Sequence, residues 1–138
     1  MREVVLDASV VLKWFAAEQR GSFEARQLRD DYQAGRLSVV VPSLLFLELL
    51  NVAGRRWRWE AEAVAELAEA LGDLSFEVSE PELPSVALWV SRGLTAYDAA
   101  YVALAERREL ALVTDDDAII NLAPGISRSL LGGSASAG

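Results

Sequence analysis

The chain has 138 residues, a length typical of one domain that buries its own hydrophobic core. Apolar residues make up 52% and charged residues 25%, as in globular proteins, and no apolar run approaches the roughly 20 residues of a membrane span. The sequence holds neither cysteine nor histidine. This excludes disulfides, a thiol nucleophile, a Ser-His-Asp triad and zinc sites built from these residues, so any acid–base or metal chemistry must come from carboxylates.

The net charge of −8 is concentrated in one stretch. Between Trp59 and Ser91 there are eight acidic residues and no basic one, whereas the remaining 13 acids are matched by 13 bases. The acidic stretch is typical of a solvated helix face and loop. Because the rest of the chain is neutral, the overall charge does not exclude a nucleic-acid partner.

Strands and helices alternate along the chain. Short hydrophobic runs predict strands over residues 3–7, 37–41, 74–78, 110–114 and, at an edge, 126–131. Helical spacing and capping signals predict helices over residues 10–15, 22–33, 43–57, 60–71, 85–91, 95–106 and 118–122. Ser43 is the expected cap of the third of these helices. Residues 1–131 are expected to form the domain, and the Gly- and Ser-rich residues 132–138 a flexible tail.

This alternation predicts an α/β fold with three layers, α/β/α, around a central parallel sheet. In such sheets ligands bind at the carboxyl ends of the strands. Asp7 and Asp116 lie at or just past the ends of two predicted strands, so both are candidates for a site at that edge.

Glu48 is the least expected residue of its helix. The segment 44–50 reads Leu-Leu-Phe-Leu-Glu-Leu-Leu, and no Lys or Arg lies three or four positions from the glutamate. A lone buried carboxylate is costly unless it is protonated, paired or bound to a metal. We therefore expect a distant part of the chain to contact Glu48. A pair with Lys13, the only lysine, or with an arginine is one alternative.

Four carboxylates share an apolar setting without a local cation: Asp7, Glu48, Asp98 and Asp116. If they lie together their charges repel, and the simplest counterion is a hard divalent cation held by oxygen ligands. Mg²⁺ or Mn²⁺ fits this description, whereas zinc does not without His or Cys. We expect the four to converge on one pocket at the carboxyl edge of the sheet.

Each aspartate also has a structural explanation. Thr95-x-x-Asp98 and Thr114-x-x-Asp117 both have capping-box spacing, with Asp in the place of Glu or Gln. Asp7 can cap the first helix, and residues 115–117 are favoured at a helix N-terminus by the helix dipole. These explanations leave Glu48 unaccounted for, since it lies five residues beyond its expected cap.

A carboxylate metal site without histidine indicates phosphoryl chemistry, because a bound ion activates water and neutralises the charge of a phosphodiester. Neither GxxxxGK[ST] nor GxGxxG occurs, which argues against hydrolysis of nucleoside triphosphates.

Residues 55–59, Arg-Arg-Trp-Arg-Trp, are the only basic and aromatic cluster. Such a cluster can grip phosphates and stack on unpaired bases. It can equally be a protein interface, or a helix end whose arginines satisfy carbonyls while its tryptophans pack inward. The sequence leaves all three open, and Arg55 and Arg56 are candidate substrate-binding residues.

Four motifs occur in a familiar order: Val-Leu-Asp-Ala-Ser over 5–9, Leu-Glu-Leu-Leu-Asn over 47–51, Leu-Thr-Ala-Tyr-Asp-Ala-Ala-Tyr-Val-Ala-Leu-Ala over 94–105 and Leu-Val-Thr-Asp-Asp over 112–116. In combination they resemble PIN-domain ribonucleases, specifically the VapC-type toxins of toxin–antitoxin pairs. The resemblance covers residues 1–131.

The resemblance implies a Mg²⁺- or Mn²⁺-dependent endoribonuclease with Asp7, Glu48, Asp98 and Asp116 as its acidic quartet. Thr114 lies where the family has Thr or Ser two positions before its last aspartate. Since Asp115 and Asp117 flank Asp116, which of the three faces the metal stays open. VapC-type toxins cut structured RNA such as transfer or ribosomal RNA, form homodimers and are inhibited by a VapB-type antitoxin.

Two rival functions are compatible with parts of this pattern. A PIN-like interaction module without catalysis could act within a repressor complex, although it has no reason to keep four repelling carboxylates together. A phosphatase of similar layers would need an Asp-x-Asp pair after the first strand, where this chain has Asp-Ala-Ser over 7–9. Met1 leads directly into the first strand, so we expect no signal peptide and a cytoplasmic location.

Overall fold

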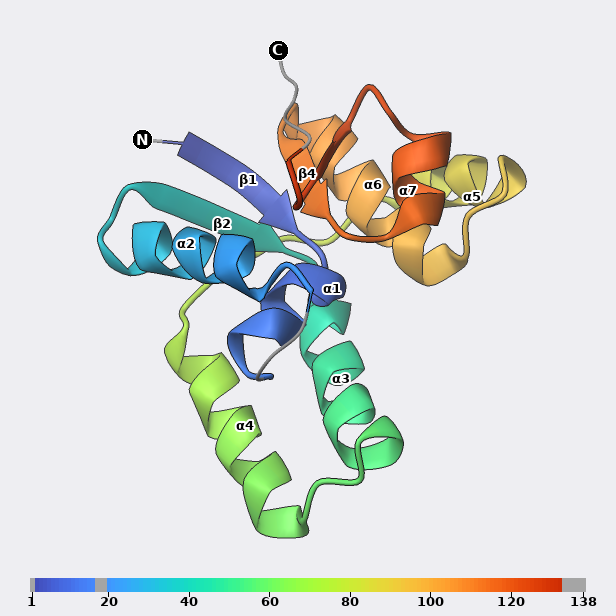
Figure 1. Cartoon of the computed structure of the whole chain (residues 1–138). Helices are drawn as coiled ribbons and strands as arrows, with labels where there is room; N and C mark the ends of the chain where they lie inside the picture. Colours follow the sequence, from blue (N-terminus) through green and yellow to red (C-terminus); the bar gives the residue numbers. More distant parts are fainter. Residues whose placement is uncertain (1, 17–19, 133–138) are drawn as a thin grey trace.

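The computed structural model describes residues 2–16 and 20–132. Met1, residues 17–19 and all of the predicted tail except Gly132 lie outside them. Within the described residues the strands form a single parallel sheet in the order β3-β2-β1-β4-β5 (Figure 1). The strands are β1 (Arg2–Leu6), β2 (Leu37–Val41), β3 (Glu77–Val78), β4 (Ala111–Thr114) and β5 (Ser127–Ser129).

The central strands are buried because their β-branched side chains face helices on both sides. Val4 pairs with Val39 of β2 and with Ala111 of β4, so β1 lies in the middle of the sheet. The chain adds β2 and β3 on one side of β1, then β4 and β5 on the other. The strand order therefore reverses between β1 and β4, which places the crevice of a parallel sheet at their carboxyl ends.

Helices cover both faces of the sheet. The helix α2 (Ser22–Gln33) packs against β2, whereas α6 (Ala96–Arg108) packs against β1 and β4 with α5 (Leu83–Ser91) on its outer side (Figure 1). Short elements follow β1 and β4: α1 (Ala8–Val11), the 3-10 turn η1 (Leu12–Trp14) and α7 (Asp117–Leu122). The predicted three-layer α/β/α fold is confirmed. None of the described helices is both long and apolar enough to cross a membrane.

A pair of helices extends from the carboxyl edge of the sheet. α3 (Leu44–Asn51) and α4 (Ala61–Asp73) lie side by side, and the connection between them lies at the end farthest from the sheet (Figure 1). A continuous α-helix over 43–57 was expected, but α3 ends at Asn51 and gives way to the π-helical turn η2 (Val52–Arg56). Gly54 lies within η2, where its poor α-helix propensity favours the change.

Two other local predictions were wrong. Ser43 has helical dihedral angles and makes no side-chain cap, and its N–H donates instead to Oε1 of Glu80 at 3.3 Å. The strand predicted over 74–78 is reduced to β3, because Leu74 ends α4 and Ser75 adopts a left-handed conformation with φ of 56°. Only Phe76 of that apolar pattern is buried, against the rings of Trp14 and Tyr32.

Candidate functional site

One pocket lies at the switch point between β1 and β4. It has a volume of about 220 Å³, and all four predicted carboxylates line it: Asp7, Glu48, Asp98 and Asp116. Asp7 follows β1, Asp116 follows β4, and the other two project from α3 and α6. The sequence prediction that the four converge on one pocket at this edge of the sheet is confirmed. In the described part of the chain, the larger hollows are each lined by fewer carboxylates and by at least one arginine.

Asp7 is the most deeply buried of the four. It caps α1, and its Oδ1 accepts hydrogen bonds from the N–H and the hydroxyl of Ser9 at 3.1 and 2.6 Å. Its Oδ2 accepts a hydrogen bond from the hydroxyl of Thr114. Burial raises the pKa of Asp7 to about 6, and the charge of Asp116 acts in the same direction, against the hydrogen bonds from Ser9 and Thr114. Asp7 therefore has both the capping role and the pocket position that the sequence suggested.

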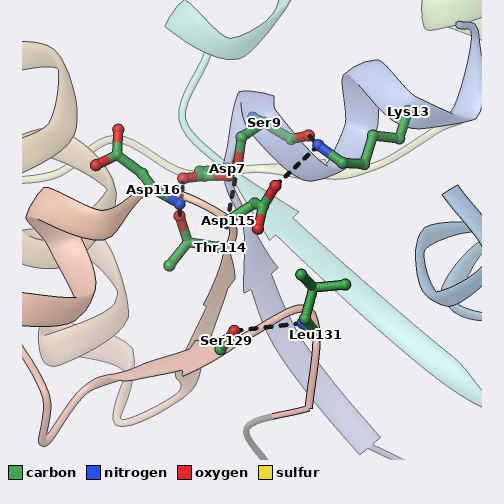
Figure 2. A network of polar contacts seen from close by, with 8 residues as sticks. All are labelled: Asp7, Ser9, Lys13, Thr114, Asp115, Asp116, Ser129 and Leu131. Carbon is green, nitrogen blue, oxygen red and sulfur yellow. Dashed lines mark hydrogen bonds and ion pairs between the residues drawn. The ribbon is translucent and has the colours of Figure 1, made fainter. Parts of the chain in front are cut away.

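Ser9 and Thr114 join the ends of β1 and β4 (Figure 2). The Ser9 hydroxyl accepts a hydrogen bond from the N–H of Asp115 at 3.0 Å, and the Thr114 hydroxyl accepts one from the N–H of Asp116 at 3.0 Å. Each hydroxyl thus donates to Asp7 and accepts from the loop that carries Asp116. The two carboxylates are held in a defined relative position by these relays.

The three consecutive aspartates after β4 have different surroundings. Asp115 pairs with the buried Lys13 at 3.1 Å, and the same ammonium donates to the carbonyl of Ser9 (Figure 2). Asp116 lines the pocket and caps α7, while Asp117 is exposed in the first turn of that helix. Only Asp116 of the three faces the pocket, and Lys13 is committed to Asp115 instead of Glu48.

Glu48 is half-buried, less enclosed than its apolar helix suggested. Its Oε1 accepts a 2.5 Å hydrogen bond from the hydroxyl of Tyr101, whose ring lies in the core. Burial raises the pKa of Glu48, the charge of Asp98 adds to this, and the Tyr101 hydrogen bond opposes it. Burial and the charge of Glu48 also raise the pKa of Tyr101, so its hydroxyl remains a donor.

Tyr101 is the pocket residue that sequence analysis missed. It lies three positions after Asp98 on α6, and residues at this spacing share a helix face. That spacing was the available signal. The sequence did not show that α3, which carries Glu48, packs beside this face of α6.

Asp98 lies in the first turn of α6. The hydroxyl of Thr95 caps this helix by accepting a hydrogen bond from the backbone N–H of Asp98 at 3.1 Å. Burial raises the pKa of the Asp98 carboxyl, and so does the charge of Asp116, while hydrogen bonding to Thr95 lowers it. The cap therefore uses the backbone of Asp98, and the carboxylate faces the pocket.

Of the two predicted substrate-binding residues, the pocket lining includes Arg56 and omits Arg55. Arg56 ends η2, and its guanidinium is the only cationic group among the described residues that line this pocket. Arg55 is exposed one position earlier.

The donor chemistry of the pocket fits a hard divalent cation, since four carboxylates face it and no softer ligand does. As placed, however, no three carboxylates in residues 2–16 and 20–132 form a group that could hold one ion. The pocket thus has suitable oxygen donors, but in this structure they are not arranged to bind one ion together.

Parallel α/β domains bind their ligands at the switch point of the sheet, where this chain has its carboxylate pocket. The family model for the PIN domain matches residues 4–124, so the chain belongs to the PIN domain family, whose members are generally nucleases. The fold is similar to the crystal structure of PAE2754 from Pyrobaculum aerophilum, with 25% sequence identity and a TM-score of 0.66. That match covers 94% of this chain and 90% of the other. Comparison with curated proteins found no match.

Proposed function

We propose that this protein is a Mg²⁺- or Mn²⁺-dependent endoribonuclease and the toxin of a VapBC pair. Its substrate would be a structured RNA such as transfer or ribosomal RNA, cut in the cytoplasm to inhibit translation. The observation that carries the proposal is the convergence of Asp7, Glu48, Asp98 and Asp116 on one pocket of a PIN domain.

In this proposal the four carboxylates hold the divalent ion. When bound, the ion supplies charge neutralisation and a water of lowered pKa for phosphodiester hydrolysis. Ser9 and Thr114 fix the Asp7 carboxylate, and Tyr101 orients Glu48. The guanidinium of Arg56, which lines the pocket, would bind a phosphate there, and Arg55 is exposed beside it.

A VapB-type antitoxin and a second copy of the chain are the proposed protein partners. Support for self-association comes from the exposed apolar side chains of α5, with Leu83 79% and Leu88 50% exposed. Exposed apolar patches of this kind mark interaction sites. Sedimentation of the isolated protein tests this part, and a monomer at high concentration would refute it.

The rival function is an inert module within a repressor complex, which would keep the carboxylate pocket without cutting RNA. The two functions make opposite predictions in a cleavage assay. The purified protein is incubated with transfer RNA or ribosomal RNA with Mn²⁺, with Mg²⁺ and with EDTA. A nuclease cuts only in the presence of metal, whereas the inert module binds its partner and cuts under none of these conditions.

Variants assign the activity to the pocket. Asp7→Asn, Asp98→Asn and Asp116→Asn should each lower the cleavage rate by on the order of 100-fold or more, because each removes a charged ligand of the proposed ion. Asp117→Asn is the matched control, since Asp117 is exposed on the neighbouring helix and should cut at the wild-type rate. Equal activity of Asp98→Asn and the control would refute the assignment.

A further inference from the structure

We propose that Trp57, Trp59 and Arg56 form a nucleotide-binding subsite beside the acidic pocket. The subsite would take one unpaired RNA nucleotide next to the phosphate that is cut. This inference rests on the ribonuclease function proposed above, and it adds a requirement on the substrate: the bases at the cut are in a loop or a single strand.

The subsite lies where α3 ends. The turn η2 replaces α-helical bonding with a wider loop, closed by a 2.9 Å hydrogen bond from the Trp57 N–H to the Val52 carbonyl. Both Val52 and Arg56 of this turn line the acidic pocket. The tryptophans follow directly in sequence, between η2 and α4. A nucleotide that contacts both Trp57 and the guanidinium of Arg56 would therefore lie at the rim of the acidic pocket.

The arginines of residues 55–58 have no ionic partner in the described part of the chain. Among the described residues, Arg55, Arg56 and Arg58 form no ion pair and no side-chain hydrogen bond, whereas Lys13 is neutralised by Asp115. Four carboxylates repel an approaching phosphate, so a substrate needs positive charge at the pocket rim. The planar guanidinium of Arg56 suits a phosphate through paired N–H donors.

The two tryptophans differ in their contacts with the hydrophobic core. Their rings lie with centroids 5.7 Å apart at an interplanar angle of 39°. Trp59 packs against the hydrophobic core, and its N–H returns to the Ala53 carbonyl at 3.0 Å. Trp57 is half-buried and lies outside that core in the described part of the chain. Trp59 thus supports the ring of Trp57, and the exposed part of the Trp57 ring would stack on the ligand.

The backbone between the two tryptophans has an unusual conformation. Arg58 adopts a left-handed conformation with φ of 57°, which is uncommon for a residue with a side chain. Arg58 separates Trp57, which is half-buried outside the core, from Trp59, which packs against the core. Backbone conformations of this kind persist where the surroundings enforce them, often at binding sites.

An unpaired base fits these features better than a duplex. In a duplex both faces of each base are stacked on neighbours, whereas an unpaired base offers a free face to an aromatic ring. A protein segment is the competing occupant, since Arg and Trp are also common in protein interfaces. The continuity of Arg56 with the acidic pocket favours RNA.

The test measures binding of a fluorescently labelled single-stranded RNA that spans the mapped cleavage site. Asp98→Asn provides a background in which the RNA is not cut. Trp57→Ala should weaken binding by roughly 10- to 100-fold, the usual effect of losing one base–aromatic stack. Trp57→Phe keeps a stacking face and should restore most of the affinity. Arg56→Ala should lower the slope of log K against log salt by about 0.7, as for one phosphate contact on a single strand.

Two controls separate stacking from a structural effect. Phe23→Ala removes an aromatic ring that is 68% exposed on α2, outside the pocket lining, and should bind as the parent. A set of RNAs, each with one base removed at a different position, is also tested. For the parent protein, removing the base that stacks on Trp57 should lower the affinity as much as Trp57→Ala does. The same position should cost the Trp57→Ala variant nothing further, because the stack is already absent.

Other results overturn the subsite and show which proposal fails. If wild type cuts RNA and Trp57→Ala binds single strands as tightly as the parent, the subsite is wrong and the nuclease function stands. If Trp57→Ala weakens only binding of the antitoxin, the cluster is a protein interface. If wild type neither binds nor cuts any RNA, the proposed function fails and the subsite with it.

Discussion

The hydroxyl of Tyr101 donates a 2.5 Å hydrogen bond to Oε1 of Glu48, joining two residues that are 53 positions apart. Tyr101 is 1% exposed, so its hydroxyl has little access to bulk water as an alternative partner. This contact gives the Tyr101 hydroxyl its acceptor and sets the direction of the Glu48 carboxylate in the pocket.

Tyr101→Phe should lower the free energy of unfolding by about 1 to 2 kcal/mol at pH 7, since it removes a hydrogen bond to a charged group. Chemical denaturation measures this, and a double-mutant cycle with Glu48→Gln should give a coupling energy of about 1 kcal/mol. Tyr97→Phe is the control, because Tyr97 is 64% exposed on the same helix. Equal stability of the two variants would show that the Tyr101–Glu48 contact contributes nothing.

Lys13→Met should destabilise the protein by about 2 kcal/mol, because it leaves the carboxylate of Asp115 without its partner. The side chain of Lys13 is 9% exposed and that of Asp115 is 26% exposed, so water compensates only part of the loss. The comparison is Arg36→Met, which breaks an exposed pair with Asp31 of similar length, 3.0 Å. That variant should lose less than about 1 kcal/mol. Equal losses in urea denaturation would contradict the prediction.

The raised pKa of Asp7 predicts a dependence of stability on pH. Because burial raises this pKa from 3.8 to about 6, protonated Asp7 favours the folded state. Its contribution is fully present below about pH 4 and is lost as the pH rises through 6, by at most about 3 kcal/mol. In EDTA, the stability of Asp7→Asn relative to wild type should therefore rise between pH 4 and pH 7. A constant difference across this range would mean an ordinary pKa for Asp7.

Metal and Asp98→Asn should have opposite effects on thermal melting at pH 7. Mn²⁺ at a hundredfold excess over its Kd should stabilise wild type by about 2.7 kcal/mol, since it binds only the folded site. Without metal, Asp98→Asn should melt higher than wild type, because it removes a half-buried charge that Asp116 repels. The Thr95 cap survives, as it uses the backbone N–H.

The same variant should show no stabilisation by Mn²⁺, whereas Asp117→Asn should respond to the ion as wild type does. A lower melting temperature of Asp98→Asn without metal would mean that Asp98 acts mainly as a helix-capping residue.

The sequence by itself determined the elements whose signals are local. The strand over 37–41 and the helix over 22–33 begin and end where the run of β-branched residues and the helical spacing predicted. The alternation of such elements was sufficient for the α/β class, because hydrophobic period and capping depend on residues within about four positions. The same local reasoning identified Asp7, Glu48, Asp98 and Asp116 as carboxylates in apolar surroundings.

Only the tertiary structure decided which groups meet. Tyr101 donates a hydrogen bond to Glu48, and Lys13 forms an ion pair with Asp115. Both contacts form because the strand order brings α3, α6 and the β4–α7 loop to one edge of the sheet. The π turn at Val52–Arg56 and the shortened β3 likewise depend on packing that no local pattern specifies. Contacts between residues 50 or 100 positions apart are set by strand order and helix packing. The residues next to each site residue in the sequence do not indicate which distant residue it will contact.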